Sequence, residues 1–394
     1  LPLSQDRGET TSVAFVDLSK AFDRVQHQQL LVALHGMGVH ASALRWFASY
    51  LAGRSQRVVT QASQSSSLAV SRGVPQGSIL GPTLFNVYLR DLPRLAETAG
   101  SKLLMFADDK TVYSSDPSKA RSEAKLSSAL EILNHHLGSI GMQINTDKTV
   151  VMQIHPKRAT GSQQQQQRQQ LQITLSNVTL GEVESTRCLG VVVDNKLSFD
   201  QHINNVVRKA SRKIGVLRRS FRQMNLFARR TFVVGVIQPD LEYALPVYLS
   251  FISAKNRNKL ASLHRRAVRV ACGASPQANI TPLLHHLNVS SFQYRSVFLF
   301  LVFIFHCYCI KPAVCLQSLF PICTSTRTTR GSTTHNMSIN RYRSMSGFLS
   351  FSSKSALVWN YLPDDLKSCT TIADFRVKLA IWLKDSLKAN HNND

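Results

Sequence analysis

Hydrophobic and polar residues follow two different patterns along the chain, and the change comes near residue 200. Before it, short apolar runs, which are typical of buried strands, alternate with longer segments of helical spacing. The runs lie at 13–18, 103–106, 150–154, 171–175 and 187–194, and the helical segments at 21–35, 43–51, 83–92 and 118–137. After residue 200, apolar residues repeat at steps of three and four, which predicts helices at 207–224, 255–270 and 372–387.

Residues 103–113 predict a tight β-hairpin with Asp108 and Asp109 at its turn, between an apolar run and a second strand-like stretch. Asp-Asp is a good turn dipeptide, so the pair alone does not indicate chemistry. Two adjacent carboxylates nevertheless repel each other unless a cation lies between them. A third acid, Asp17, stands near the end of the run 13–18, where a carboxylate is costly unless it is paired, hydrogen-bonded or bound to metal.

Residues 72–82, with the sequence RGVPQGSILGP, hold three glycines and two prolines and predict a fixed loop before a helix. Small residues let the backbone approach another chain or a ligand closely. A purely structural role for the loop fits the sequence equally well.

The net charge of the chain indicates which kind of ligand it attracts. The 394 residues contain 47 Lys+Arg and 23 Asp+Glu, a net charge of +24, and the field of such a protein attracts polyanions, above all nucleic acid and second an anionic membrane. Fifteen of the basic residues and only two acids, Asp240 and Glu242, lie between Asn204 and Val270, which favours a phosphate-binding surface over a merely solvated face. The seven cysteines form no CxxC pair, and no secretory signal is present, so we expect an intracellular protein of the nucleus or cytoplasm with free thiols.

Asp17, Asp108 and Asp109 can meet if their strands are neighbours in one sheet. Such a cluster supplies the hard oxygen ligands that Mg²⁺ prefers, with Mn²⁺ as an alternative. Two metals about 3.5–4 Å apart can activate a 3′-hydroxyl and stabilise a leaving pyrophosphate. Paired carboxylates also serve glycoside hydrolysis, but the basic second half argues for a polyanionic substrate. The residues therefore predict metal-dependent phosphoryl transfer on nucleic acid.

Several motifs in order carry a resemblance to a known family. Residues 15–23 (FVDLSKAFD), 73–82 (GVPQGSILGP) and 106–109 (FADD) resemble three successive palm motifs of reverse transcriptases from non-LTR, LINE-type retrotransposons of the Jockey-like kind. Residues 141–149 resemble the next palm motif, Cys188-Leu189-Gly190 the primer-grip hairpin, and 357–363 the C-terminal part of such elements. The resemblance implies an α+β fold in which a polymerase palm, an antiparallel sheet packed on helices, precedes an α-helical thumb and a mostly helical C-terminal segment.

The resemblance also implies roles for single residues. Asp17, Asp108 and Asp109 would bind the metals, with the backbone carbonyl of Leu18 as a further ligand. Phe22 would be the steric gate that rejects a ribose 2′-hydroxyl, although a core aromatic is the plainer interpretation. Gln76 and Gly77 would contact the nascent base pair and the template. Lys148 would protonate the leaving pyrophosphate, although it could equally be a surface lysine. Cys188, Leu189 and Gly190 would contact the primer.

The expected domains are a palm at 1–200 with a glutamine-rich loop at 161–172, a basic helical thumb at 201–310, and a linker and C-terminal segment at 311–394. The expected partners are an RNA template, a DNA primer and deoxynucleoside triphosphates. Only sixteen residues precede Asp17, so we expect an N-terminally truncated chain that lacks most of the fingers. A catalytically inactive protein that only binds RNA or duplex is the alternative. The apolar stretch 297–310 is short for a membrane span, and no stable membrane association is expected.

Overall fold

A computed structural model describes residues 2–156, 171–310, 316, 320, 336–339 and 341–391. It divides into two compact units, one spanning Arg7–Gly190 and the other combining Pro2–Asp6 with Val191–Asp394. Most of the glutamine-rich loop and much of the predicted linker lie outside the described residues. The partition into palm, thumb and C-terminal segment stays a prediction.

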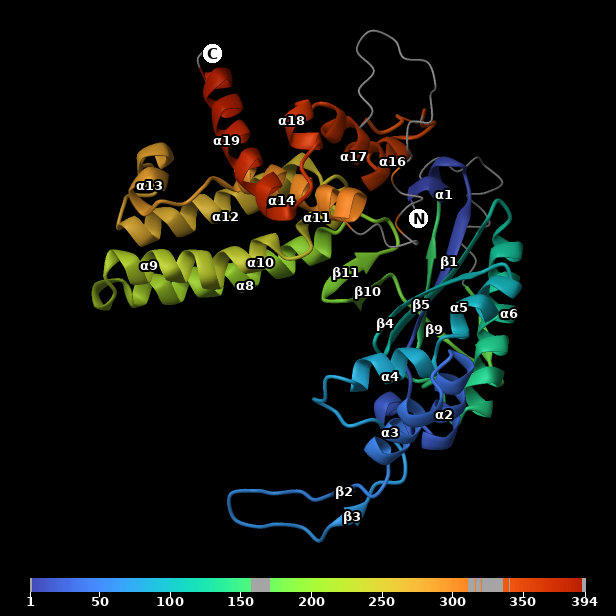
Figure 1. The fold of residues 1–394 in the computed structure, drawn as a ribbon. Helices are drawn as coiled ribbons and strands as arrows, with labels where there is room; N and C mark the ends of the chain where they lie inside the picture. The colour runs from blue at the N-terminus through green and yellow to red at the C-terminus, as the bar shows by residue number, and fades with distance from the viewer. Residues whose placement is uncertain are drawn as a thin grey trace. The chain divides into compact units, whose positions relative to one another are not determined.

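The first unit is built on a five-stranded sheet with the order β4-β5-β1-β6-β9 (Figure 1). These strands are β4 (Lys102–Phe106), β5 (Asp109–Asp116), β1 (Thr10–Val16), β6 (Val150–Ile154) and β9 (Gly181–Glu182). Strand β1 is central and antiparallel to both β5 and β6, whereas β9 joins β6 in parallel. The central position explains the continuous apolar run, since Val13, Ala14 and Val16 are all buried.

Helices α5 (Leu92–Thr98) and α6 (Lys119–Ser139) pack on this sheet. The helix predicted over 118–137 is confirmed, and its Leu126, Leu130, Leu133 and Leu137, at helical spacing, are buried in the core of the unit. Further elements of the unit are α2 (His27–Gly36), α3 (Ala41–Leu51), α4 (Gly81–Tyr88), β7 (Thr174–Leu175), β8 (Val178–Thr179) and β10 (Ser185–Cys188). The hairpin of β2 (Ser55–Gln56) and β3 (Leu68–Ala69) extends away from the rest of this unit (Figure 1). Sheet and helices together confirm the predicted α+β fold.

The helix predicted over 21–35 is wrong as one element. It is split into η1 (Ala21–Arg24) and α2 by Val25 and Gln26, of which Gln26 is in an extended conformation. The carbonyl of Phe22 accepts a hydrogen bond from the amide of Val74, and that of Val25 accepts one from the amide of Gly73. Both carbonyls therefore bind the loop of residues 72–82, called the glycine-proline loop below, instead of a helical amide.

Two other predicted elements are also interrupted. The helix over 83–92 ends at Tyr88 and a new one starts at Leu92, where Pro93 lies in the first turn, a position that proline favours. The strand over 187–194 is broken after β10, because Leu189 (φ 46°) and Gly190 (φ 82°) adopt the left-handed backbone of a tight turn before β11 (Val191–Asp194).

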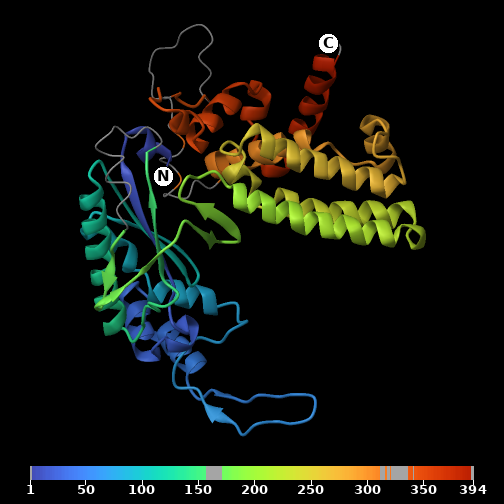
Figure 2. The same cartoon turned by 180° about the vertical axis from the view of Figure 1, so that it is seen from behind.

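The second unit is helical. Its long helices are α8 (Asp200–Arg219), α12 (Ala254–Cys272), α14 (Phe292–Phe305), α17 (Phe351–Asn360) and α19 (Ile372–His391), seen from behind in Figure 2. Shorter ones are α1 (Pro2–Asp6), η2 (Phe221–Gln223), α9 (Leu226–Phe232), η3 (Val233–Ile237), α10 (Gln238–Glu242), α11 (Leu245–Tyr248), α13 (Ile280–Leu287), η4 (His306–Ile310), α16 (Met345–Phe348) and α18 (Asp364–Lys367). One core of this unit forms around Phe305, Phe375 and Trp359, whose rings are fully buried.

Helix α14 and η4 together give one helix, Phe292–Ile310, that is long and apolar enough to cross a membrane by length and composition. It begins five residues before the predicted start because the hydroxyl of Ser291 caps it, accepting from the amide of Tyr294. Of this stretch 39% is buried, and Leu301, Ile304 and Phe305 belong to the core. A core helix passes the same test of length and composition, so the expected lack of membrane association stays a prediction.

Candidate active site

The acidic pair lies at the tip of the β4–β5 hairpin. Phe106 pairs with Asp109 across the hairpin, which leaves Ala107 and Asp108 as a two-residue turn. Ala107 adopts φ 52°, a conformation that costs roughly 1–2 kcal/mol for a residue with a Cβ atom. Asp108 thus belongs to the turn, while Asp109 is the first residue of β5; both side chains are exposed.

Asp17 follows β1 on the neighbouring strand. Val16 pairs with Lys110, and continuing this register by one residue places Asp17 opposite Asp109. The amide of Asp17 donates to the hydroxyl of Thr149 at 3.2 Å, and its carbonyl accepts from the amide of Asn145 at 2.9 Å. These bonds attach the segment 141–149 to the end of β1, so the first, third and fourth palm-like motifs meet at one place.

Leu18 is held in an isolated antiparallel bridge with Ile144. The hydrogen bonds of this bridge run from the Ser19 amide to the Gln143 carbonyl and from the Asn145 amide to the Asp17 carbonyl. Leu18 therefore occupies a non-hydrogen-bonded position, and its own carbonyl points away from the bridging segment. This orientation is compatible with the predicted contribution of the Leu18 carbonyl to a metal site.

A cavity of about 490 Å³ collects several predicted site residues. Its lining includes Asp17, Leu18, Phe22, Gln76, Asp108 and Lys148. Asp109 does not line it, and within the described part of the chain no three His, Cys, Asp or Glu side chains are close enough to hold a metal ion. Two carboxylates and one backbone carbonyl are a hard-oxygen donor set that fits a divalent ion completed by phosphate and water oxygens. The geometry thus fits a metal held by Asp17 and Asp108, with Asp109 beside them.

The glycine-proline loop is fixed against the segment that follows Asp17. Gly73 has φ +90°, and a Cβ atom there would lie 3.0 Å from the Cα of Asp23, so glycine is required. Nε2 of Gln76 donates to Oδ1 of Asp23 at 3.0 Å. A smaller hollow of about 380 Å³ brings Gln76 and Gly77 together with Phe22 and Asp108.

Phe22 is packed on the core while it also borders these cavities. Its ring stacks on that of Phe85 in α4, with centroids 4.3 Å apart. The ring is half-buried and also lines the cavity that contains Asp17 and Asp108, so its role as a steric gate stays a prediction.

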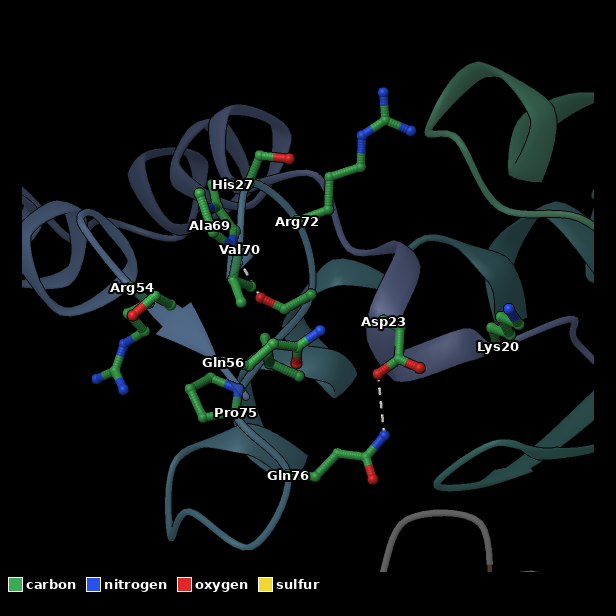
Figure 3. A pocket seen from close by; sticks show the side chains of 14 residues that line it. Lys20, Asp23, His27, Arg54, Gln56, Ala69, Val70, Arg72, Pro75 and Gln76 are labelled. Atoms are coloured by element: carbon green, nitrogen blue, oxygen red, sulfur yellow. Dashed lines mark hydrogen bonds between the residues drawn. The ribbon is translucent and has the colours of Figure 1, made fainter. Parts of the chain in front are cut away.

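A larger hollow of about 850 Å³ (Figure 3) shares Lys20, Asp23 and Gln76 with the 490 Å³ cavity, which is called the acidic cavity below because Asp17 and Asp108 line it. Three cations border it, Lys20, Arg54 and Arg72, and none of them takes part in an ion pair within the described residues. The guanidinium groups of Arg54 and Arg72 point away from one another (Figure 3). Cations spread around a rim suit a chain of phosphates better than a single anion.

Cys188 lies beside the β4–β5 hairpin. Burial raises the pKa of its thiol, although a hydrogen bond with Thr111 of β5 acts in the other direction. Leu189 and Gly190 form the turn that follows. The structure thus places Cys188 next to the strand that begins with Asp109, and its contact with a primer stays a prediction.

Sequence reasoning missed several residues of this site. Asn145 lines the acidic cavity, Thr149 holds the backbone of Asp17, and Asp23 holds Gln76. The signal was available for Asp23 and Asn145, since each lies inside a motif singled out by its resemblance. Thr149 closes the same motif as Asn145, but its hydrogen bond with the amide of Asp17 depends on how β6 begins beside β1.

Together, an antiparallel sheet with acids at the ends of adjacent strands, a glycine-proline loop beside them and a stacked aromatic at the cavity wall define the palm of a nucleic-acid polymerase. Residues 3–193 match the family model described as reverse transcriptase (RNA-dependent DNA polymerase), and this part of the chain is a reverse transcriptase domain.

Similar curated proteins include several from non-LTR retrotransposons of Drosophila melanogaster, in agreement with the resemblance seen in the motifs. The chain is 26% identical over 301 residues to a probable RNA-directed DNA polymerase from transposon BS, covering 73% of this chain and 32% of that protein. It is 28% identical over 272 residues to the RNA-directed DNA polymerase from mobile element jockey, covering 66% and 28%. It is 29% identical over 255 residues to a putative 115 kDa protein of the type-1 element R1DM, covering 64% and 24%.

The chain thus spans about a third or less of the length of these curated relatives. Among solved structures, a telomerase from Candida albicans in complex with a fragment of telomeric RNA matches 73% of this chain and 47% of its own, with 13% identity and a TM-score of 0.24. A score this low supports no conclusion about the fold.

Proposed function

We propose that this chain is the polymerase core of a non-LTR retrotransposon reverse transcriptase, which adds deoxynucleotides to a primer 3′-hydroxyl on an RNA template. One observation carries the proposal: Asp17 and Asp108, 91 residues apart in sequence, line one cavity together with the glycine-proline loop residue Gln76. Family membership over residues 3–193 supports the same reaction.

Asp17 and Asp108, with the carbonyl of Leu18, would hold Mg²⁺ or Mn²⁺, and Asp109 would add charge beside them. A pair of bound metals supplies the Lewis acidity that activates the primer hydroxyl and stabilises the leaving pyrophosphate. Lys148 lines the same cavity and is exposed, and its ammonium would donate a proton to the leaving pyrophosphate.

The other residues orient the substrates. Phe22 would close the cavity wall against a ribose 2′-hydroxyl, while Gln76 and Gly77 would contact the nascent base pair and the template. Cys188, Leu189 and Gly190 would hold the primer end near β5. The unpaired cations Lys20, Arg54 and Arg72 would neutralise phosphates that pass over the larger hollow.

The helical unit would grip the duplex through its phosphates. On α8, Lys209 and Lys213 already pair with Asp240, at 2.8 and 2.6 Å. The exposed arginines Arg212, Arg218 and Arg219 form no ion pair with any described residue, and their charge is available to phosphate. Such contacts bind without reading sequence.

A primer-extension assay on an RNA template with Mg²⁺ tests the proposal. We expect extension by the wild type and a loss of at least about 10³-fold in the Asp108→Asn variant, since a metal ligand is removed. Asp147→Asn is the matched control, because Asp147 is an exposed acid of the 141–149 segment that does not line the cavity. Extension that is indifferent to Asp108→Asn would contradict the assignment of the site, and salt-dependent duplex binding without any extension would favour the binding-only alternative.

A further inference from the structure

Lys110 is a buried cation next to the acidic pair. Its side chain is on the core side of β5, opposite Val16, and the residue is 3% exposed. Two other lysines of the described chain are buried, Lys119 and Lys367, and each has a carboxylate within 4 Å, Glu123 and Asp364. Lys110 has none within that distance in the described part of the chain. A buried ammonium without a direct ion pair is costly, so its position needs a reason.

The ammonium is directed at the backbone of the catalytic turn. Nζ of Lys110 donates to the carbonyl of Asp108 at 3.1 Å and approaches that of Ala107 at 3.4 Å. It also lies 5.2 Å from the centre of the Phe85 ring, on which Phe22 stacks. The lysine therefore holds the strained Ala107–Asp108 turn from beneath and contacts the aromatic pair of the cavity wall.

The three acids of the site act on the same ammonium. Asp109 directly precedes Lys110 in β5, Nζ is bound to the backbone of Asp108, and Asp17 directly follows Val16, which pairs with Lys110. A positive charge that feels all three carboxylates does part of what a bound metal does, since it offsets their mutual repulsion. By the same interaction it repels an incoming divalent cation.

We propose that Lys110 is a built-in counter-cation of the acidic cluster, which keeps the Asp108 turn in place without metal and lowers the affinity of the cluster for a divalent ion. The inference rests on the metal site of the proposed function. It makes Lys110 a positioning residue, because its ammonium is buried and bound to backbone carbonyls.

The direct test is metal binding without nucleic acid or nucleotide. Mn²⁺ is titrated into the metal-free full chain, and free Mn²⁺ is followed by electron paramagnetic resonance. We expect Lys110→Gln to lower the Kd for Mn²⁺ about tenfold, because one positive charge near a divalent ion is removed while a side chain that can donate to the turn remains. Lys110→Arg retains the charge and should stay within about threefold of the wild type.

Lys102→Gln is the matched control, since Lys102 is an exposed lysine on the adjacent strand β4 and its loss should change the Kd less than twofold. An unchanged or higher Kd in Lys110→Gln overturns the proposal, as does an equal gain in the Lys102 variant. Thermal unfolding in EDTA provides a second readout. Lys110→Gln should melt lower than the wild type without metal, and saturating Mn²⁺ should reduce this difference; a variant as stable as the wild type in EDTA also contradicts the proposal.

The Asp17→Asn/Asp108→Asn double variant separates this inference from the proposed function. If it binds Mn²⁺ as the wild type does, the metal site itself is misplaced. If it does not bind and Lys110→Gln shows no gain, only the role of Lys110 fails.

Discussion

Phe22 and Phe85 stack with their ring centroids 4.3 Å apart and their planes inclined by 27°. Phe85 is fully buried in α4, whereas Phe22 is half-buried and faces the cavity that Asp17 and Asp108 also line. The fixed ring of Phe85 therefore sets the position of Phe22, and the wall of the cavity is part of the core. A change in this pair should alter substrate selection and stability together.

Replacing Phe22 by alanine should relax the discrimination against ribonucleotides. The ring would no longer exclude a 2′-hydroxyl, and we expect the ratio of kcat/KM for a deoxynucleotide to that for the matching ribonucleotide to fall by about 100-fold. Steady-state single-nucleotide extension measures this ratio. Phe22→Tyr retains the ring and should retain the discrimination; an equal loss in both variants would mean that the ring is not the gate.

Gly73→Ala should destabilise the first unit more than Gly77→Ala. Both glycines have positive φ, but a Cβ atom at Gly73 would meet the backbone of Asp23 and Phe22 at 3.0–3.2 Å, while nothing lies within 4 Å at Gly77. We expect a cost of about 1 kcal/mol for Gly77→Ala from conformation alone and about 3 kcal/mol for Gly73→Ala. Urea unfolding of the two variants side by side checks the order, which equal costs would contradict.

The stability of the second unit should fall in mild acid because of His264. This side chain is 2% exposed, its Nε2 has no partner in the described structure, and burial lowers its pKa to about 4, while Glu242 opposes the shift and Arg295 and Arg265 reinforce it. An unfolded histidine titrates near 6.5, so the unfolded state takes up protons first. Stability is complete above about pH 6.5 and decreases by up to about 3 kcal/mol as the pH falls toward 4.

Unfolding midpoints measured between pH 7 and 4 check this pH dependence. His264→Leu, which removes the titrating group, should lose most of the slope in this window. His286→Leu changes an exposed histidine of α13 and should leave the slope as it is in the wild type. A wild-type slope in His264→Leu would assign the acid sensitivity to other groups.

Binding of duplex should depend on salt through the unpaired arginines of the second unit. For Arg212→Gln/Arg218→Gln/Arg219→Gln we expect the slope of log K against log [salt] to become shallower by about 2 to 3, close to one unit per lost phosphate contact. In the control Lys209→Gln/Lys213→Gln the charges removed are already engaged by Asp240, and the slope should change by less than about one. Fluorescence anisotropy at several salt concentrations distinguishes the two variants.

The identity and order of the chemical groups could be predicted from local patterns in the sequence. The apolar run before Asp17, the hairpin with Asp108 and Asp109, the glycine-proline loop and the basic helix α8 were all visible as local patterns, because strand burial, turn chemistry and helical periodicity act over a few neighbouring residues. Boundaries were less visible: Val25 leaves the helix because its carbonyl serves Gly73, a partner 48 residues away.

Which of these groups contact one another depends on the tertiary structure. Only the register of β1 against β5 places Asp17 opposite Asp109 and turns Lys110 into the core. The pairing of Gln76 with Asp23 and the stacking of Phe22 on Phe85 likewise join residues more than 50 positions apart. Such contacts depend on which strands become neighbours, a property of the whole fold that no local pattern encodes.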